Sequence, residues 1–265
     1  MAKTTIEWTD YTCNCFWGCR QGCDYCQARS MARRFGRRLG EKRGYPEWMA
    51  DSMARFEPVF LADQLLKIPA KPCRVFISFM GDWAGPWHEE WTRQQMFSVI
   101  KQHPQHTFQL LTKQASRLRQ WSPYPDNCWV GVTVTDDAKF REAQRVFDDI
   151  VCRVRFISFE PFLDTIDTEY MPGFGLAGHI CQWAIIGQRT PRRLATAPDY
   201  RDIERMIKLA DKGNIKVFLK DNLRPVLPVQ APFYTRDPGI CEECEAGDPC
   251  HVCGEGVTLR QEFPR

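Results

Sequence analysis

Short runs of apolar and β-branched residues recur along the chain, each bounded by glycine, proline or polar residues. Runs of this length and composition are typical of buried strands. They predict strands at Arg74–Phe79, Thr107–Leu111, Trp129–Val134, Val154–Phe159, Trp183–Ile186 and Ile215–Leu219, and a further strand near Thr12–Phe16.

Apolar residues at helical spacing lie between these runs and predict helices around 140–150 and 203–210. A third helix is indicated by the repeat of Ala28, Met31, Ala32 and Phe35. Strands that alternate with helices form βαβ units with a parallel sheet. We therefore expect an α/β fold: a partial or complete β/α barrel of the TIM type, with a doubly wound open sheet as the alternative.

The composition changes after Pro225, where proline, glycine, cysteine and acidic residues dominate up to Pro264. A segment with so few large apolar residues could hardly fold locally without a metal. We therefore expect a barrel domain over residues 1–228 and a small metal-binding appendage with four cysteines over residues 229–265.

The 265 residues are 43% hydrophobic and 26% charged, with a net charge of only +3. No stretch approaches 18 apolar residues, which argues against a membrane span. Because Met1–Asp10 carry no apolar run, we expect no secretory signal and a cytoplasmic location. The unusual number is thirteen cysteines. In a long chain of this kind, clustered cysteines bind metal more often than they form disulfides.

The cysteines fall into two clusters and a scattered group. Four scattered ones lie beside apolar runs and are expected to be small buried residues: Cys73, Cys128, Cys152 and Cys181. In the N-terminal cluster, Cys19, Cys23 and Cys26 have the spacing C-x3-C-x2-C. Three thiolates on one loop can hold three irons of a [4Fe–4S] cluster and leave the fourth iron open. The alternative is a zinc site, with Cys13 or Cys15 as the fourth ligand.

The C-terminal cluster consists of two C-x2-C pairs: Cys241, Cys244, Cys250 and Cys253. Four thiolates suffice for a closed tetrahedral zinc site, and an auxiliary [4Fe–4S] cluster is the alternative. His251 lies inside the second pair and is expected to face outward.

The N-terminal spacing, with Tyr25 before the last cysteine, resembles the signature of the radical S-adenosylmethionine (SAM) superfamily. The flanking sequence is similar to a phage-associated radical SAM-like family of unknown function, with matches along almost the whole chain. These are Thr4–Asp10 (TTIEWTD), Met80–Asp82 (MGD), His106–Lys113 (HTFQLLTK), Gly131–Val134 (GVTV), Ser158–Pro161 (SFEP) and Gln261–Pro264 (QEFP). The chain departs from that family at Cys13, at Cys15 and at Gly187–Arg189 (GQR).

Polar residues of the matched segments follow predicted strands: Asp82, Lys113, Thr133, Glu160, Gln188 and Lys220. In a parallel barrel these strand ends converge on one mouth. The resemblance implies that Ser78 and Asp82 meet the amine of SAM and that Thr133 and Glu160 meet its ribose. Lys113 and Lys220 would hold the SAM carboxylate or an anionic substrate. Accordingly, Lys113, Glu160 and Lys220 are candidate catalytic residues, and Tyr25, Ser78, Asp82, Thr133, Glu160 and Gln188 are candidate cofactor-binding residues.

Between positions 29 and 43 there are seven basic residues and one acid, Glu41. Such a block fits an electrostatic footprint for phosphate, although it also fits a solvated helix face. The candidate nucleic-acid contacts are Arg29, Arg33, Arg34, Arg37 and Arg38.

The resemblance implies a radical SAM enzyme supplied with electrons by a donor such as flavodoxin or ferredoxin. If the chain is phage-encoded, it would act in the host cytoplasm. The expected substrate is a modified base in nucleic acid, most specifically an aminoacyl–thymine adduct in DNA that is isomerised from a nitrogen to a carbon linkage. Two alternatives stay open: radical chemistry on a small metabolite, peptide or damaged base, and a non-catalytic zinc protein that binds nucleic acid.

Overall fold

The computed structural model describes residues 1–163, 166, 180–190, 197–228, 234–235 and 258–264. The chain divides into two compact units. The first comprises Met1–Thr133 and Ala138–Phe156, and the second comprises Val134–Asp137 and Ile157–Arg265. Within the described ranges, no helix is long and apolar enough to cross a membrane.

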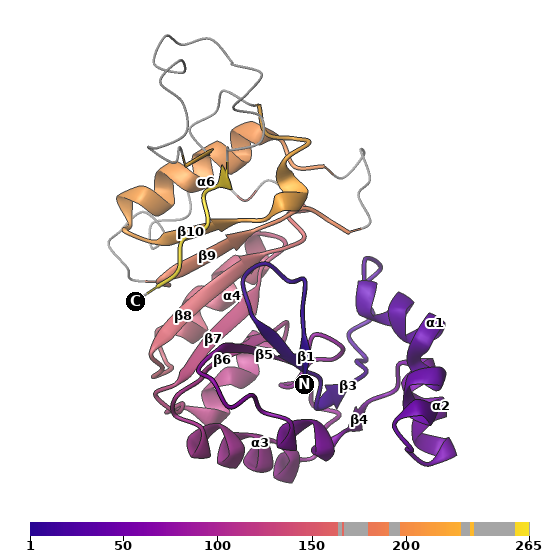
Figure 1. Ribbon diagram of the computed structural model, residues 1–265. Coiled ribbons are helices and arrows are strands. Elements are labelled where there is room, and N and C mark those ends of the chain that lie inside the picture. Colours follow the sequence, from indigo (N-terminus) through magenta and orange to yellow (C-terminus); the bar gives the residue numbers. More distant parts are fainter. Residues whose placement is uncertain (164–165, 167–179, 191–196, 229–233, 236–257, 265) are drawn as a thin grey trace. The chain divides into compact units, whose positions relative to one another are not determined.

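The first unit is built on a mostly parallel sheet (Figure 1). Its strands are β1 (Ala2–Lys3), β2 (Tyr11–Cys13), β5 (Arg74–Ile77), β6 (Thr107–Thr112), β7 (Cys128–Thr133) and the first half of β8 (Val154–Phe159), in the spatial order β1-β2-β5-β6-β7-β8. The strand β1 is antiparallel to β2, whereas β2, β5, β6 and β7 are parallel. Every residue of β7 is buried, as expected for a strand covered on both faces.

Helical segments connect these strands: η1 (Ala62–Leu66), α3 (Glu90–Gln102), η2 (Ala115–Trp121) and α4 (Asp137–Phe147). Met96 and Ile100 of α3 are fully buried, and so is Phe147 of α4. Their spacing places one apolar side of each helix in the interior.

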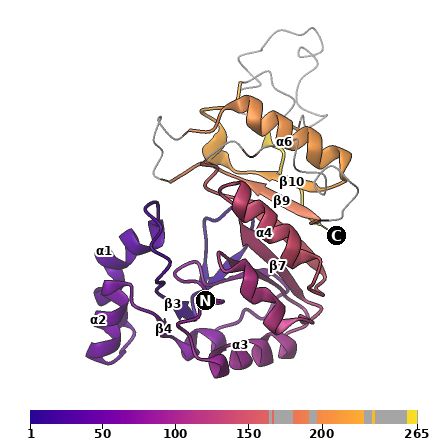
Figure 2. The same cartoon turned by 180° about the vertical axis from the view of Figure 1, so that it is seen from behind.

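A helical pair stands beside the sheet of the first unit (Figures 1 and 2). It consists of α1 (Gln27–Lys42) and α2 (Glu47–Arg55), and it is flanked by β3 (Phe16–Trp17), which pairs with β4 (Val59–Phe60). The two helices approach closely because α1 carries glycines at the contact. A Cβ atom at Gly36 would lie 2.6 Å from the Met53 carbonyl oxygen, and one at Gly40 would lie 2.8 Å from the Ala50 Cα.

The second unit contains the end of β8, then β9 (Trp183–Ile186) and β10 (Lys216–Leu219), which are parallel and in the order β8-β9-β10. Its further elements are α6 (Tyr200–Lys212), η5 (Asp221–Leu223), β11 (Tyr234–Thr235) and β12 (Thr258–Leu259). The Asp199 carboxylate caps α6 by accepting from the Arg201 amide at 2.9 Å. The chain end runs along β10, where the Leu219 amide donates to the Arg260 carbonyl at 2.8 Å.

The structure confirms an α/β fold with a mostly parallel sheet and a strand in each predicted run. The strand predicted at Arg74–Phe79 ends earlier, at Ile77, because Ser78 adopts a left-handed backbone conformation with φ of +66°. Closure into a barrel stays a prediction, since strand order alone does not establish it. The predicted domain boundary between residues 228 and 229 also stays a prediction, because residues 229–233 and 236–257 are not described.

Two details of the burial pattern differ from the sequence analysis. Helix α1 forms where it was predicted, but Phe35 is 49% exposed and only Ala32 of the four repeat residues is fully buried. Cys128 and Cys181 are buried as expected. The expectation is wrong in part for Cys73 and Cys152, which are half-buried.

Candidate functional site

The loop between β3 and α1 carries Cys19, Cys23 and Cys26, all half-buried. Its start is fixed at Gly18, which has φ of +81° and donates its amide to the Met80 carbonyl at 2.8 Å. A Cβ atom at this position would lie 2.2 Å from the Glu57 carbonyl oxygen. The loop therefore depends on a residue without a side chain at its entrance.

Two of the three thiols already accept hydrogen bonds from the loop backbone. The Cys19 sulfur accepts from the Gln21 amide, and the Cys26 sulfur accepts from the Arg29 amide as the N-cap of α1, both at 3.3 Å. The pKa of Cys19 is raised to about 12, mainly by burial and in smaller part by the charges of Asp82, Cys23 and Cys26. Gathering these groups as anions is therefore unfavourable, and a bound cationic centre would relieve that repulsion.

Three thiols on one loop are compatible with a multi-iron cluster, and the choice between such a cluster and a zinc ion stays a prediction. Within the part of the chain that the structure describes, no three His, Cys, Asp or Glu side chains are placed to hold one metal ion. In an iron–sulfur cluster each thiolate binds a different iron, so the sulfurs need not converge on one point. The suggested fourth zinc ligands are engaged elsewhere: Cys13 and Cys15 are fully buried, and the Cys13 thiol donates to the Gln64 carbonyl at 3.5 Å.

Ser78 and Asp82 lie on the loop that follows β5, and their polar atoms form buried hydrogen bonds with neighbouring segments. The Ser78 hydroxyl accepts from the Phe16 amide at 3.2 Å. The Asp82 carboxylate accepts from the Thr112 hydroxyl at 2.6 Å and from the Lys113 amide at 3.0 Å. Burial raises the pKa of Asp82, and these hydrogen bonds counteract that effect. A role for Ser78 and Asp82 at the SAM amine stays a prediction; their observed role is to position neighbouring loops.

Three of the candidate residues meet in the first unit. The Lys113 ammonium lies 5.7 Å from the centre of the Tyr25 ring, within the range of a cation–π contact. The same ammonium group donates to the Thr133 hydroxyl at 3.4 Å. Tyr25 belongs to the cysteine loop, Lys113 follows β6, and Thr133 ends β7. The fold thus joins the cysteine loop to the carboxyl ends of two parallel strands.

In the second unit the structure brings Glu160 and Lys220 together. The Lys220 ammonium donates to the Glu160 carboxylate at 2.5 Å, and the two side chains are 14% and 23% exposed, respectively. Gly187 leaves the space for this pair, because a Cβ atom there would lie 2.9 Å from Lys220 Cδ and 3.2 Å from Glu160 Cδ. Gln188 is held by Asn222, whose side-chain oxygen accepts from the Gln188 amide at 3.2 Å.

The basic block covers most of α1 and extends just past its end, and its members differ in availability. Arg37 is paired with Glu41 at 2.9 Å, with Glu47 at 3.2 Å and also with Asp51. Arg29 is half-buried, with its guanidinium 5.9 Å from the centre of the Phe56 ring. The remaining candidates are exposed: Arg33, Arg34 and Arg38. The C-terminal candidate ligands, Cys241, Cys244, Cys250 and Cys253, lie outside the described residues, as does His251.

His88 was not singled out from the sequence, because its loop shows no periodic pattern. It is only 8% exposed, its ring stacks edge-on against Phe16 with centres 4.8 Å apart, and its Nε2 has no hydrogen-bond partner. The pKa of His88 is lowered to about 4, mainly by burial and in smaller part by the charges of Arg93 and Arg20. The imidazole is therefore neutral in the folded protein near pH 7.

This shift predicts a loss of stability in mild acid. Unfolded His88 takes up a proton near pH 6.5, whereas the folded protein resists protonation down to about pH 4. Stability therefore falls as the pH drops below 6.5, by about 2 kcal/mol between pH 7 and pH 5. Urea unfolding of the wild type and of His88→Phe at both pH values measures this contribution. The variant should lose about 2 kcal/mol less; equal losses in both proteins would assign the acid sensitivity to other groups.

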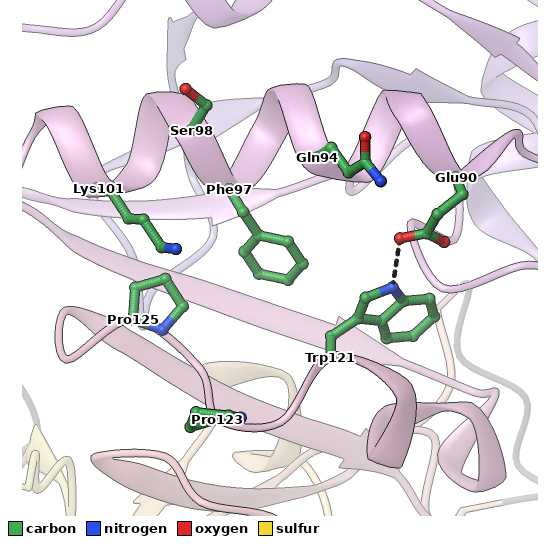
Figure 3. A pocket seen from close by; sticks show the side chains of 8 residues that line it. All are labelled: Glu90, Gln94, Phe97, Ser98, Lys101, Trp121, Pro123 and Pro125. Carbon is green, nitrogen blue, oxygen red and sulfur yellow. Dashed lines mark hydrogen bonds between the residues drawn. The ribbon is translucent and has the colours of Figure 1, made fainter.

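A groove of about 390 Å³ lies against α3, apart from all the residues predicted from the sequence. Figure 3 shows Phe97, Trp121, Pro123 and Pro125 as its apolar lining, with Glu90 and Lys101 toward opposite ends. The Trp121 indole donates to the Glu90 carboxylate at 2.9 Å, so this carboxylate fixes the position of the Trp121 ring in the wall of the groove. The groove contains no cluster of titratable groups of the kind that marks catalytic sites.

Comparison with known proteins gives one match. The model of a family described as "Protein of unknown function (DUF5131)" matches residues 3–210. No curated protein and no solved structure matches the chain.

Proposed function

The chain belongs to this DUF5131 family, and from its own residues we propose that it is a radical SAM enzyme. The observation that supports the proposal most strongly is the meeting of Tyr25, from the C-x3-C-x2-C loop, with Lys113 and Thr133 at the ends of parallel strands. In parallel α/β folds, active sites are built at the carboxyl ends of the strands.

Cys19, Cys23 and Cys26 would hold a [4Fe–4S] cluster with one open iron. When bound, the cluster would pass one electron from a donor such as flavodoxin or ferredoxin to the sulfonium of SAM. A C–S bond of SAM would then break to give methionine and a 5′-deoxyadenosyl radical. This radical would take a hydrogen atom from the substrate. The protein itself binds and orients the reactants and excludes competing reactions.

Lys113 is the better candidate for holding the SAM carboxylate. Its ammonium group has no ion-pair partner among the described residues, and it contacts the Tyr25 ring and the Thr133 hydroxyl. The charge of Lys220 is already compensated by Glu160 at 2.5 Å. In the second unit, Lys220 would fix the orientation of the Glu160 carboxylate, and the role at the ribose that the sequence resemblance implies for Glu160 stays a prediction.

The finer parts of the proposal follow the sequence resemblance. The sheet would form a partial or complete barrel, and the C-terminal cysteines would bind structural zinc or an auxiliary cluster. The substrate would be a modified nucleic-acid base, with isomerisation of an aminoacyl–thymine adduct in phage DNA as the most specific form, and the protein would act in the host cytoplasm. The exposed Arg33, Arg34 and Arg38 support a nucleic-acid substrate.

Anaerobic reconstitution with iron and sulfide tests the chemistry. The reconstituted protein, supplied with SAM and dithionite, should show [4Fe–4S] absorbance and release 5′-deoxyadenosine, measured by chromatography with mass detection. Zinc binding without either signal would contradict the proposal and favour a non-catalytic zinc protein. Mass analysis of DNA nucleosides from cells with and without the protein would then test the substrate; unchanged nucleosides beside active SAM cleavage would favour a small-molecule or peptide substrate.

A further inference from the structure

One side of α1 presents exposed cations around an exposed aromatic ring. We call this the arginine face and define it by Arg34, Phe35 and Arg38, which lie within about 100° of one another around the helix. The Phe35 ring is 49% exposed, and the Arg34 guanidinium lies 5.1 Å from its centre. Exposed aromatic rings next to arginine are the combination on which unpaired bases stack.

The charges of this face are not neutralised within the protein. Among the described residues, Arg33, Arg34 and Arg38 have no ion-pair partner, whereas Arg37 on the same helix pairs with acids of both α1 and α2. The nearby acids are therefore engaged by Arg37. The arginine face retains the positive charges of Arg34 and Arg38, which can attract phosphate.

Helix packing keeps this face turned outward. Ala32, Gly36 and Gly40 repeat at intervals of four residues and form the buried side of α1. Gly36 and Gly40 contact the backbone of α2 too closely for any rotation of α1 that would place a side chain there. Phe35 is therefore kept on the exposed side of the helix.

The helix also begins at the cysteine loop, because Cys26 is its N-cap. Arg34 lies eight positions beyond Cys26, which corresponds to about 12 Å along the helix axis. This distance is about the length of three or four stacked nucleotides. A strand held on α1 would therefore have a neighbouring base within reach of the loop.

We propose that the arginine face binds single-stranded nucleic acid, or the unpaired strand next to a flipped base, with Arg34 and Arg38 at phosphates and Phe35 stacked on a base. The inference rests on the proposed function and specifies the state in which its substrate is bound. A continuous duplex offers Phe35 no exposed base to stack on, whereas an unpaired strand does.

Binding of a fluorescein-labelled dT12 oligonucleotide to the intact chain, followed by anisotropy at several salt concentrations, tests the proposal. Phe35→Leu keeps an apolar helix former but removes the stacking ring, so affinity should fall about tenfold. The double variant Arg34→Gln/Arg38→Gln should reduce the slope of log affinity against log salt by about 1.4. Lys208→Gln is the control, because Lys208 is an exposed cation outside the arginine face that pairs with Glu204 at 2.9 Å; it should leave both quantities unchanged.

The proposal is overturned if dT12 is not bound at low salt, if Phe35→Leu binds like the wild type, or if Lys208→Gln weakens binding as much as the double variant. It is also overturned if a matched 12-base-pair duplex binds more tightly than dT12, or if phosphatidylserine vesicles bind and dT12 does not. The assay needs neither SAM nor a reductant. A protein that releases 5′-deoxyadenosine but ignores dT12 therefore rejects this inference alone, and one that binds dT12 without cleaving SAM rejects the proposed chemistry alone.

Discussion

Replacing Cys26 by serine is expected to leave the protein folded and to abolish its formation of 5′-deoxyadenosine. The Cys26 sulfur has two roles in the structure. It caps α1 by accepting from the Arg29 amide at 3.3 Å, and it is the last of the three proposed cluster ligands. A serine hydroxyl is a good N-cap, but it cannot replace a thiolate as a soft iron ligand.

Comparison with alanine separates the two roles. Cys26→Ala should lose both the cap and the cluster, with a cost of about 1 kcal/mol in unfolding free energy from the cap. Cys26→Ser should unfold close to the wild type in urea, yet show no [4Fe–4S] absorbance after reconstitution and no product above the reagent blank. Cys19→Ala and Cys23→Ala should abolish the same signals.

The control is Cys152→Ser, since Cys152 is a half-buried cysteine outside the loop whose thiol donates to the Val154 carbonyl at 3.5 Å. Serine preserves that donor, so iron content and product formation should match the wild type. A Cys26→Ser protein with wild-type product formation would exclude this thiol from the cluster. Loss of activity in Cys152→Ser as well would point to a general sensitivity to cysteine replacement.

The strands could be predicted because each is a short apolar run with a clear boundary, and burial on both faces leaves that pattern in the sequence. The early end of β5 could not be predicted. The residues Ser78 and Phe79 continue the apolar run RVFISF, but the chain turns at Ser78, whose hydroxyl accepts from the distant Phe16 amide. A tertiary contact of this kind leaves no local signal.

Helix α1 illustrates a second limit. Its existence follows from helical spacing, but its buried side does not, because glycine carries almost no hydropathy signal. Gly36 and Gly40 are buried where α2 approaches, and Phe35 is exposed instead. The pairing of Arg37 with Glu47 and Asp51 depends on the same helix contact. The hydropathy pattern therefore predicts the helix correctly but assigns the wrong residues to its buried side.

The candidate site was predictable only in part. The loop cysteines stand out by spacing, and the order of parallel strands places Lys113 and Thr133 at neighbouring strand ends. The internal use of the Asp82 carboxylate could not be foreseen, because it depends on the Thr112 hydroxyl and the Lys113 amide lying opposite. A polar residue after a strand looks the same in the sequence whether it faces a ligand or holds a loop.

The largest expected loss of stability comes from Gly18→Ala, at the entrance of the cysteine loop. Gly18 has φ of +81°, a conformation that costs an alanine roughly 1 kcal/mol or more. In addition, the new Cβ atom would lie 2.2 Å from the Glu57 carbonyl oxygen and 2.8 Å from that of Phe56. Backbone cannot move aside as a flexible side chain does, so we expect a total loss of about 4 kcal/mol in unfolding free energy.

Gly22→Ala is the matched comparison within the same loop. Gly22 has φ of +80°, but a Cβ atom there would meet nothing within 4 Å. It should therefore cost only the conformational penalty, about 1 kcal/mol, and the difference between the two variants measures the close approach at Gly18. Because the Gly18 amide donates to the Met80 carbonyl at 2.8 Å, displacement there would also move Cys19 relative to the Asp82 loop. The amount of iron bound after reconstitution should fall in Gly18→Ala and stay at the wild-type level in Gly22→Ala. Equal losses of stability and iron in both variants would show that the loop responds to backbone conformation alone.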